Sequence, residues 1–377
     1  MNDSFYLRLK AFANARFWQF LHTDFLLLVL LLGLACAGLF ILYSASGQND
    51  AMVERQIVRV ILGFCSCLVL AQVSPKYMRR ASPLLYVGVF ILLIMVLFWG
   101  VGAKGAQRWL EVPGIGRFQP SELMKIMMPM AIAWYFSNRH LPPSFKYIFV
   151  VLVMVFLPVL IIAKQPDLGT ALLVGFSGIF VLFLAGLGWR YILAAMFATP
   201  VAGLFLWQVM HSYQKQRVMT FLNPESDPLG FGWNIIQSKT AIGSGGLEGK
   251  GWLNGTQAQL EFLPESHTDF IIAVLAEEFG MFGCIMLLLI YLLIIARGLY
   301  IAAMAEDNFG RLLAGSLTLT FFVYVFVNIG MVSGILPVVG VPLPLISYGG
   351  TSIITIMSTF GILMSIHTHK RANKRAR

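Results

Sequence analysis

The chain has 377 residues, of which 58% are hydrophobic and only 12% are charged. Soluble globular proteins average about 45–50% apolar and about 25% charged residues. The composition therefore excludes a soluble enzyme with one membrane anchor and a disordered scaffold. It also excludes a nucleic-acid-binding protein despite the net charge of +10, because the basic residues have a simpler explanation in the membrane topology.

Long apolar runs recur along the whole sequence and predict an all-α polytopic membrane protein. A run of about 20 apolar residues crosses a hydrocarbon core of about 30 Å, and its backbone must bond internally as a helix. The first run is too long for a signal peptide and is followed by many more. We predict one membrane domain over residues 1–377 with ten spans: 25–44, 56–74, 82–102, 119–137, 147–163, 168–187, 190–210, 269–296, 311–331 and 350–367.

The distribution of basic residues predicts the orientation of these spans. Lys and Arg accumulate in cytoplasmic segments of membrane proteins. With the N-terminus in the cytoplasm, the inside segments hold 16 of the 27 basic residues but only 4 of the 17 acidic ones. An even number of spans then places both termini of this multi-pass protein in the cytoplasm.

Three segments are predicted on the outer face. Residues 104–120 carry Arg108 and Trp109, and residues 211–268 form one long loop that contains the glycine-rich stretch GSGGLEGKGWLNGTQ (243–257). Loops of this length are usually functional or disordered, and the aromatic residues of this one favour packing on the membrane surface. Residues 333–348 contain three prolines, too many for a spanning helix, so a re-entrant segment is predicted there.

Several ionisable residues lie at membrane depth, where they are costly and are functional candidates. Glu122 and Lys125 are three residues apart on one predicted helix face, so an ion pair is the simplest explanation for their burial. Asp167 and Asp269 each start a predicted helix, and N-capping is the alternative to a functional role. Glu277 and Glu278 lie further along the Asp269 helix, and the sequence does not assign their role beyond possible hydrogen bonds between helices.

The candidate residues share one location. The outer ends of their predicted elements carry Arg108, Glu122, Lys125, Asp167, Lys239 and Asp269. Carboxylates and cations around an outward-facing cavity bordered by apolar helices suit an amphiphilic substrate with an anionic head group. A carboxylate can act as a general base, and Lys or Arg can bind phosphate. This pattern predicts a class of substrate and leaves the reaction open.

No metal site is predicted. The four cysteines, Cys36, Cys65, Cys67 and Cys284, lie in apolar runs without the spacing of a zinc site. Asp and Glu side chains could supply oxygen ligands to a divalent cation, but the sequence contains no dedicated ligand cluster. It therefore leaves a role for a divalent cation open.

Several motifs resemble the SEDS family of cell-wall polymerases. They are RWL (108–110), FQPSELMK (118–125), KQPDLGT (164–170), FLPESHTDFIIAVLAEEFG (262–280) and PLPLISYGG (342–350). They follow the family order from Arg108 to Gly350, and ten helices agree with the family fold. The segments IIQSKTAIGSGGLEGKGWLNGTQ and LEFLPESHTDF are more similar to the elongation branch than to the division and sporulation branches.

This resemblance implies a peptidoglycan glycosyltransferase that polymerises lipid II at the outer face of the inner membrane. It implies a class B penicillin-binding protein as transpeptidase partner, together with other elongation-complex proteins and membrane lipids, and no nucleic acid. The family's catalytic aspartate corresponds to Asp269, and further important positions correspond to Trp109, Glu122, Lys125 and Asp167. Ser347, in the PLPLISYGG motif, is assigned to the same cavity. Asp269 would act as general base in an inverting transfer.

Two other functions compete with this one. A transporter or a flippase for the lipid-linked precursor also has many spans and intramembrane charges, but the single long outer loop has no counterpart in the first half of the chain. A non-catalytic scaffold of the elongation machinery would tolerate neutralisation of the outer charges. Substitution of those charges therefore discriminates between the enzyme and the scaffold.

Overall fold

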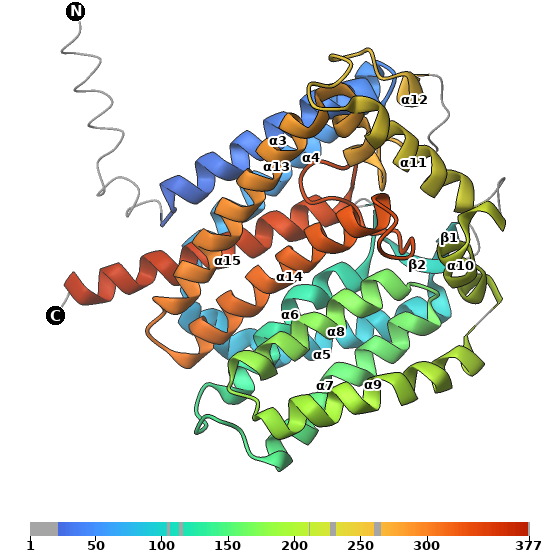
Figure 1. Cartoon of the computed structure of the whole chain (residues 1–377). Helices are drawn as coiled ribbons and strands as arrows, with labels where there is room; N and C mark the ends of the chain where they lie inside the picture. The colour runs from blue at the N-terminus through green and yellow to red at the C-terminus, as the bar shows by residue number, and fades with distance from the viewer. Residues whose placement is uncertain are drawn as a thin grey trace, which may run out of the picture.

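The computed structural model describes residues 22–375 except 104–105, 113–115, 211, 227–230 and 260–264. Within these residues, ten helices have 17 residues or more (Figure 1). They are α3 (Phe25–Ala45), α4 (Asp50–Gln72), α5 (Pro75–Trp99), α6 (Pro120–Phe136), α7 (Phe145–Lys164), α8 (Leu168–Leu184), α9 (Trp189–Val209), α13 (Ile271–Ala303), α14 (Asn308–Val332) and α15 (Thr351–Arg375). Each overlaps one of the ten predicted segments, but α4 and α5 begin six and seven residues earlier than predicted, and α13 and α15 end seven and eight residues later.

Six of these helices are long and apolar enough to cross a membrane: α3, α5, α7, α13, α14 and α15. Their outward faces remain apolar, as Leu84 at 76% exposure and Leu292 at 60% illustrate. Large exposed apolar side chains along whole helices are unfavourable in water and are normal for a surface solvated by lipid. By length and composition, at least these six helices of the described part of the chain can therefore cross a membrane.

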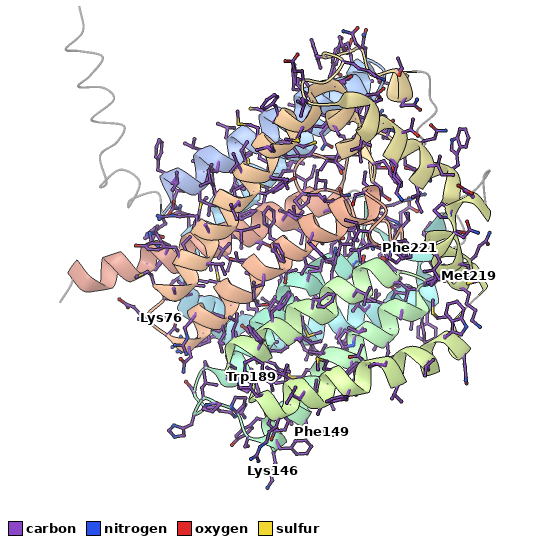
Figure 2. All side chains as sticks on the ribbon, viewed as in Figure 1. Lys76, Lys146, Phe149, Trp189, Met219 and Phe221 are labelled. Carbon is purple, nitrogen blue, oxygen red and sulfur yellow. The ribbon has the colours of Figure 1, made fainter. Side chains whose placement is uncertain are left out.

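The long helices form a bundle with two distinct ends. At the terminal end, defined by Asp24, Arg297 and His367, the Asp24 carboxylate is 2.6 Å from Arg297 Nη2 and 3.5 Å from His367 Nε2. At the opposite end, called the site end, α3 ends at Ala45. The backbone oxygen of Ala45 accepts a hydrogen bond from the Ser266 hydroxyl. Lys76 lies at the terminal end, whereas Met219 and Phe221 lie at the other (Figure 2).

Small residues allow the helices to approach closely. Between α4 and α15, Gly361 leaves no room for a Cβ because the backbone oxygen of Cys67 occupies that position. One turn earlier on α15, Met357 packs against Gly63 of α4. Such contacts are the usual packing device of helices in membranes, where lipid is as apolar as the side chains.

The segment between α5 and α6 is a small antiparallel sheet, which corrects the all-α prediction. Strands β1 (Val101–Ala103), β2 (Ala106–Val112) and β3 (Gly116–Phe118) have the order β1-β2-β3. Val101 pairs with Trp109, and Leu110 pairs with Phe118. The central strand β2 carries Arg108 to the site end of the bundle.

The predicted loop 211–268 also contains regular structure. It includes the helices α10 (Ser212–Leu222), α11 (Phe231–Gly245) and α12 (Thr256–Gln259) and the 3₁₀ turn η1 (Pro224–Ser226). Helix α11 packs on α13 at the site end (Figure 1). The segment 333–348 contains no helix, as its prolines predict, and it folds back into the bundle with Val341, Leu343 and Ile346 buried.

Candidate active site

Asp269 lies immediately before helix α13. The helix starts at Ile271, and its N-cap position is Phe270, which forms no side-chain cap hydrogen bond. Asp269 is therefore one residue outside the capping position that its sequence suggested. Asp269 is half-buried at the site end of the bundle.

Gly340 forms one wall beside this carboxylate. It has a φ of +72°, and a Cβ at this position would lie 3.5 Å from Asp269 Oδ2. The left-handed conformation favours glycine, and the missing side chain leaves space next to the carboxylate. The neighbouring Val339 and Val341 pack against Gly169 in the first turn of α8, where a Cβ would lie 2.7 Å from Val339 O. The segment 339–341 thus lies between Asp269 and the start of α8.

The backbone around Asp269 is fixed by two buried polar side chains. Asn328 Nδ2 of α14 donates to Asp269 O at 2.9 Å and to Val341 O at 2.7 Å. Ser347 Oγ donates to Thr268 O at 2.6 Å and accepts from Leu343 N at 2.8 Å. The structure thus places Ser347, one of the predicted cavity residues, beside Asp269, where its hydroxyl contacts the backbone of residues 268 and 343.

Asp167 occupies the N-cap of α8 and also makes side-chain contacts that capping alone does not require. It accepts a hydrogen bond from Thr170 N at 3.3 Å, in agreement with the capping alternative. Gln119 Nε2 donates to its Oδ2 at 2.7 Å, and Arg108 Nη1 is 3.8 Å from its Oδ1. Arg108 Nη2 also donates to the carbonyl of Pro166. The β2 strand, the start of α6 and the start of α8 meet at this carboxylate.

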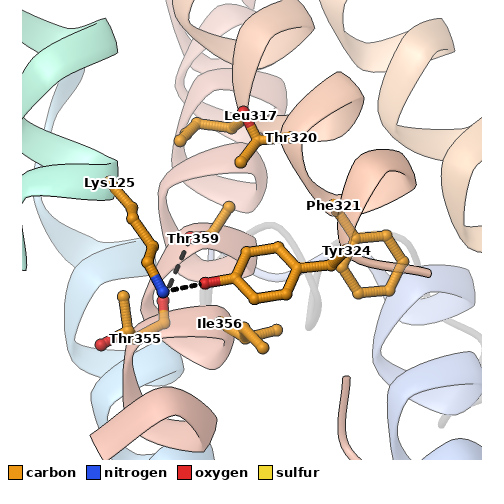
Figure 3. Close-up of a pocket in the computed structure, with 8 residues that line it drawn as sticks. All are labelled: Lys125, Leu317, Thr320, Phe321, Tyr324, Thr355, Ile356 and Thr359. Atoms are coloured by element: carbon orange, nitrogen blue, oxygen red, sulfur yellow. Dashed lines mark hydrogen bonds between the residues drawn. The ribbon is translucent and has the colours of Figure 1, made fainter. Parts of the chain in front are cut away.

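Glu122 and Lys125 form the predicted ion pair, with Lys125 Nζ 2.6 Å from Glu122 Oε1. Both are buried, at 6% and 5% exposure. Lys125 Nζ also donates to the hydroxyl of Tyr324 on α14, and it lies 4.8 Å from the centre of that ring. The lysine points from α6 into a small cavity between α14 and α15 whose polar lining includes Thr320 (Figure 3). A buried ammonium with these partners is satisfied in the low-dielectric interior.

Two of the predicted residues are less closely connected to this cluster. Lys239 on α11 is exposed, and its side chain lies against Gly334, six residues before Gly340. Trp109 is half-buried on β2, next to Arg108 in sequence, and pairs with Val101. Within the described residues, no group of three or more His, Cys, Asp or Glu side chains is arranged to hold a metal ion.

Four further residues of the site were not predicted from the sequence: Gln119, Tyr324, Asn328 and Gly340. Asn328 gave a detectable signal, since it is a lone amide within an apolar run, and such residues in spanning helices face partners inside the bundle. Tyr324 gave none, because a tyrosine in an apolar run is common. Together with the predicted residues, these side chains bring two aspartates, one arginine and one lysine–glutamate pair to the same end of the bundle.

A family model described as "Cell cycle protein", for FtsW, RodA and SpoVE, matches residues 24–372. The chain belongs to this family. The motif-based prediction of a SEDS protein is thereby confirmed. The match covers nine of the ten long helices completely, α15 as far as residue 372, and every residue of the candidate site.

Relatives and solved structures agree with this assignment. The peptidoglycan glycosyltransferase MrdB of Escherichia coli K12 is 55% identical over 356 residues, which cover 94% of this chain and 96% of MrdB. A probable peptidoglycan glycosyltransferase FtsW of Geobacter metallireducens is 37% identical over 98% of this chain and 99% of that protein.

Two structural relatives have the same fold over most of their length. A chain from a structure on the coordination of polymerization and crosslinking by a peptidoglycan synthase complex has a TM-score of 0.82 and 30% identity, and the match covers 92% of this chain and 98% of that one. The rod shape determining protein RodA of Thermus thermophilus has a TM-score of 0.69 and 29% identity, with 92% and 96% covered. With its apolar helices, this chain is a multi-pass membrane protein of mainly helical structure.

Proposed function

We propose that this chain is a peptidoglycan glycosyltransferase that polymerises lipid II into glycan strands during cell elongation. The observation that carries the proposal is its 55% identity to the peptidoglycan glycosyltransferase MrdB over 94% of the chain. The structural similarity to RodA of Thermus thermophilus, named as a rod shape determining protein, supports a role in elongation.

Asp269 is proposed as the general base. Chain growth requires a hydroxyl of the acceptor sugar to attack an anomeric carbon that carries a lipid pyrophosphate. As the new C–O bond forms and the bond to pyrophosphate breaks, a carboxylate near the hydroxyl accepts its proton. One direct displacement inverts the anomeric carbon. The half-buried position of Asp269 beside Gly340, whose missing side chain leaves space next to Oδ2, supports this assignment.

The cations have different proposed roles. The departing pyrophosphate is anionic and is stabilised by cations rather than by an acid. Arg108 has 36% of its side chain exposed and lies beside Asp167, so it is the proposed pyrophosphate contact, with the exposed Lys239 as a second cation. Lys125 is buried between Glu122 and Tyr324, which supports a role in shaping the cavity.

The proposed setting is the bacterial inner membrane. One membrane domain would cross it ten times, with both termini in the cytoplasm, the active site facing outwards and residues 333–348 re-entrant from the outer side. The ten helices of 17 residues or more in the described part of the chain support the count. The accumulation of Lys and Arg in the segments at the terminal end supports the orientation.

The proposed partners are a class B penicillin-binding protein, which would cross-link the strands, and other elongation-complex proteins. The similarity to a chain of a peptidoglycan synthase complex that coordinates polymerization with crosslinking supports the first of these. Lipid II is the proposed substrate, and its lipid tail would remain among the membrane lipids that surround the exposed apolar helix faces.

The decisive experiment incubates the purified chain in liposomes with lipid II, alone and with the penicillin-binding protein from the same organism. Glycan strands above the level made by the Asp269→Asn variant support the enzyme. Translocation of lipid II across the bilayer without strand synthesis would instead identify a flippase. Neither activity with either preparation would favour a scaffold.

A further inference from the structure

Helix α13 is interrupted at Gly280, and a glycine-rich loop replaces the missing helical hydrogen bonds. Gly280 has φ 60° and ψ −156°, which no residue in an α-helix adopts. On one side of the break, Lys250 N and Gly251 N donate to the carbonyls of Glu277 and Glu278, both at 2.9 Å. On the other side, Met281 N donates to Gly246 O at 3.0 Å. The backbone groups freed by the break are therefore satisfied by the loop.

The loop and the helix touch where neither has a side chain. Gly249 has φ +81°, and a Cβ on Gly280 would lie 2.5 Å from Gly249 N. A Cβ on Gly249 would lie 2.6 Å from Gly280 N. Because both residues have positive φ and both face backbone atoms, the contact requires glycine at both positions.

The side chain of Glu277 completes the attachment. It is fully buried, and its Oε1 accepts hydrogen bonds from Lys250 Nζ at 2.7 Å, Thr256 Oγ1 at 3.0 Å and Gln257 N at 3.1 Å. Glu278 accepts a hydrogen bond from Ser44 at the end of α3. We call the loop residues 245–257, with Glu277 and Glu278, the clasp.

The clasp holds one end of the helical segment that follows Asp269. This segment, Ile271–Phe279, is nine residues long and extends about 13 Å. Every residue from Ile271 to Glu278 is buried. Its other end is held by Asn328 and Ser347, whose contacts with residues 268–269 form part of the site. Asp269 thus lies just before a short buried helical segment whose two ends are both held by hydrogen bonds.

We propose that Glu277 is a positioning residue for Asp269. By fixing the clasp, it sets the position of the segment Ile271–Phe279 and with it the aspartate carboxylate relative to Gly340. This proposal rests on the proposed function of Asp269 as general base. The interruption at Gly280 has a role in this proposal. It separates the segment Ile271–Phe279, which follows Asp269, from the remaining 23 residues of α13, Met281–Ala303.

The test compares Glu277→Ala, Glu277→Gln and Lys250→Met with the wild type. Glu248→Gln is the matched control, because Glu248 is an exposed glutamate in the same loop. Glu277→Ala should lower kcat for strand synthesis by about 10- to 100-fold, the loss typical of a small displacement of a catalytic group, and leave KM for lipid II within about twofold. Glu277→Gln, which still accepts from Thr256 and Gln257, should retain more activity. Lys250→Met removes the same ion pair from the loop side without changing α13.

Hydrogen exchange of residues 266–279 in the same samples provides a readout independent of activity. Faster exchange there, with a thermal midpoint close to wild type and a normal Glu248→Gln control, is the expected result. Faster hydrogen exchange in the Glu277 variants with a wild-type kcat would overturn the positioning role. A lowered kcat with unchanged exchange would also overturn it. If the wild type makes no strands, the proposed enzymatic function fails, while the exchange measurements still report whether Glu277 fixes this segment. If Glu277→Ala does not fold, Glu277→Gln and Lys250→Met decide the outcome.

Discussion

Tyr324 and Asn328 lie one turn apart on α14, and each contacts a different half of the candidate site. The Tyr324 hydroxyl accepts a hydrogen bond from Lys125 Nζ, whereas Asn328 Nδ2 donates to Asp269 O at 2.9 Å. Residues four positions apart share a helix face and are separated by about 6 Å along the axis. One helix turn therefore fixes the lysine pair relative to the proposed base.

The Tyr324 hydroxyl is predicted to contribute to this arrangement. Tyr324→Phe removes a hydrogen bond to a buried charged group, which should reduce stability by about 1.5–3 kcal/mol, and it should lower strand synthesis. Thermal unfolding in detergent and a lipid II polymerisation assay measure the two effects. Tyr77→Phe is the control, because Tyr77 is 67% exposed at the terminal end. Equal behaviour of the two variants would refute the role of Tyr324.

The Glu122–Lys125 pair is predicted to behave as one unit. Lys125→Met and Glu122→Gln each leave a buried partner without its counterpart, and breaking a buried pair in this way typically costs about 3–5 kcal/mol. The double variant should be more stable than the sum of the single changes predicts, because it leaves no isolated charge. A double-mutant cycle of thermal unfolding measures this coupling. Wild-type behaviour of both single variants would remove the pair from structure and from catalysis.

Gly340 is predicted to require the absence of a side chain. Gly340→Ala forces an L-residue into the left-handed region, at a cost of about 1–2 kcal/mol, and places a methyl group 3.5 Å from Asp269 Oδ2. The rate of strand synthesis should fall by more than the loss of folded protein accounts for. Gly33→Ala is the matched control, since a Cβ there meets nothing within 4 Å. Normal activity of a folded Gly340→Ala protein would show that substrate does not approach past this position.

The positions of the long helices followed directly from the sequence, because apolar runs of sufficient length have few alternatives in a membrane. The features that were missed depend on contacts between distant residues. The break at Gly280 depends on Gly249, 31 positions earlier, so the local periodicity of α13 continues through it. The short strands around Trp109 are set by pairing with Val101 and are too brief for a clear alternation.

The candidate site shows the same division. The i, i+3 spacing of Glu122 and Lys125 was sufficient to predict their ion pair, which the structure contains. The hydrogen bond from Asn328 to Asp269 O joins α14 to the segment before α13 across 59 residues, and nothing local to either residue indicates it. Local spacing therefore identified pairs on one helix, whereas partners on different helices required the structure.

The topology is predicted to place both termini in the cytoplasm and the glycine-rich loop outside. Reporter fusions after Arg377 and within residues 245–256 should report opposite sides of the membrane. The loop lies at the site end of the bundle, at the outer end of α3 in the proposed orientation. Because this loop forms the clasp, a reporter inserted there can disturb activity. The fusion is therefore used only to determine on which side of the membrane the loop lies. Identical signals from the two fusions would contradict the ten-span arrangement.

Asp269→Asn is predicted to abolish strand synthesis while leaving folding and partner binding nearly unchanged. Asparagine has the same shape and caps helices about as well as aspartate, and the backbone oxygen that Asn328 contacts is unaffected by the change. If Asp269 only stabilised the start of α13, the variant should lose less than about 1 kcal/mol and remain active. If Asp269 accepts the proton of the acceptor hydroxyl, an amide cannot replace it, and the rate should fall by about 10²- to 10⁴-fold. The measurement is strand formation from purified lipid II beside a thermal-unfolding curve. Abundant strands from a folded Asn variant would exclude Asp269 as the base, and Asp167, already paired with Gln119 and close to Arg108, would become the next carboxylate to test.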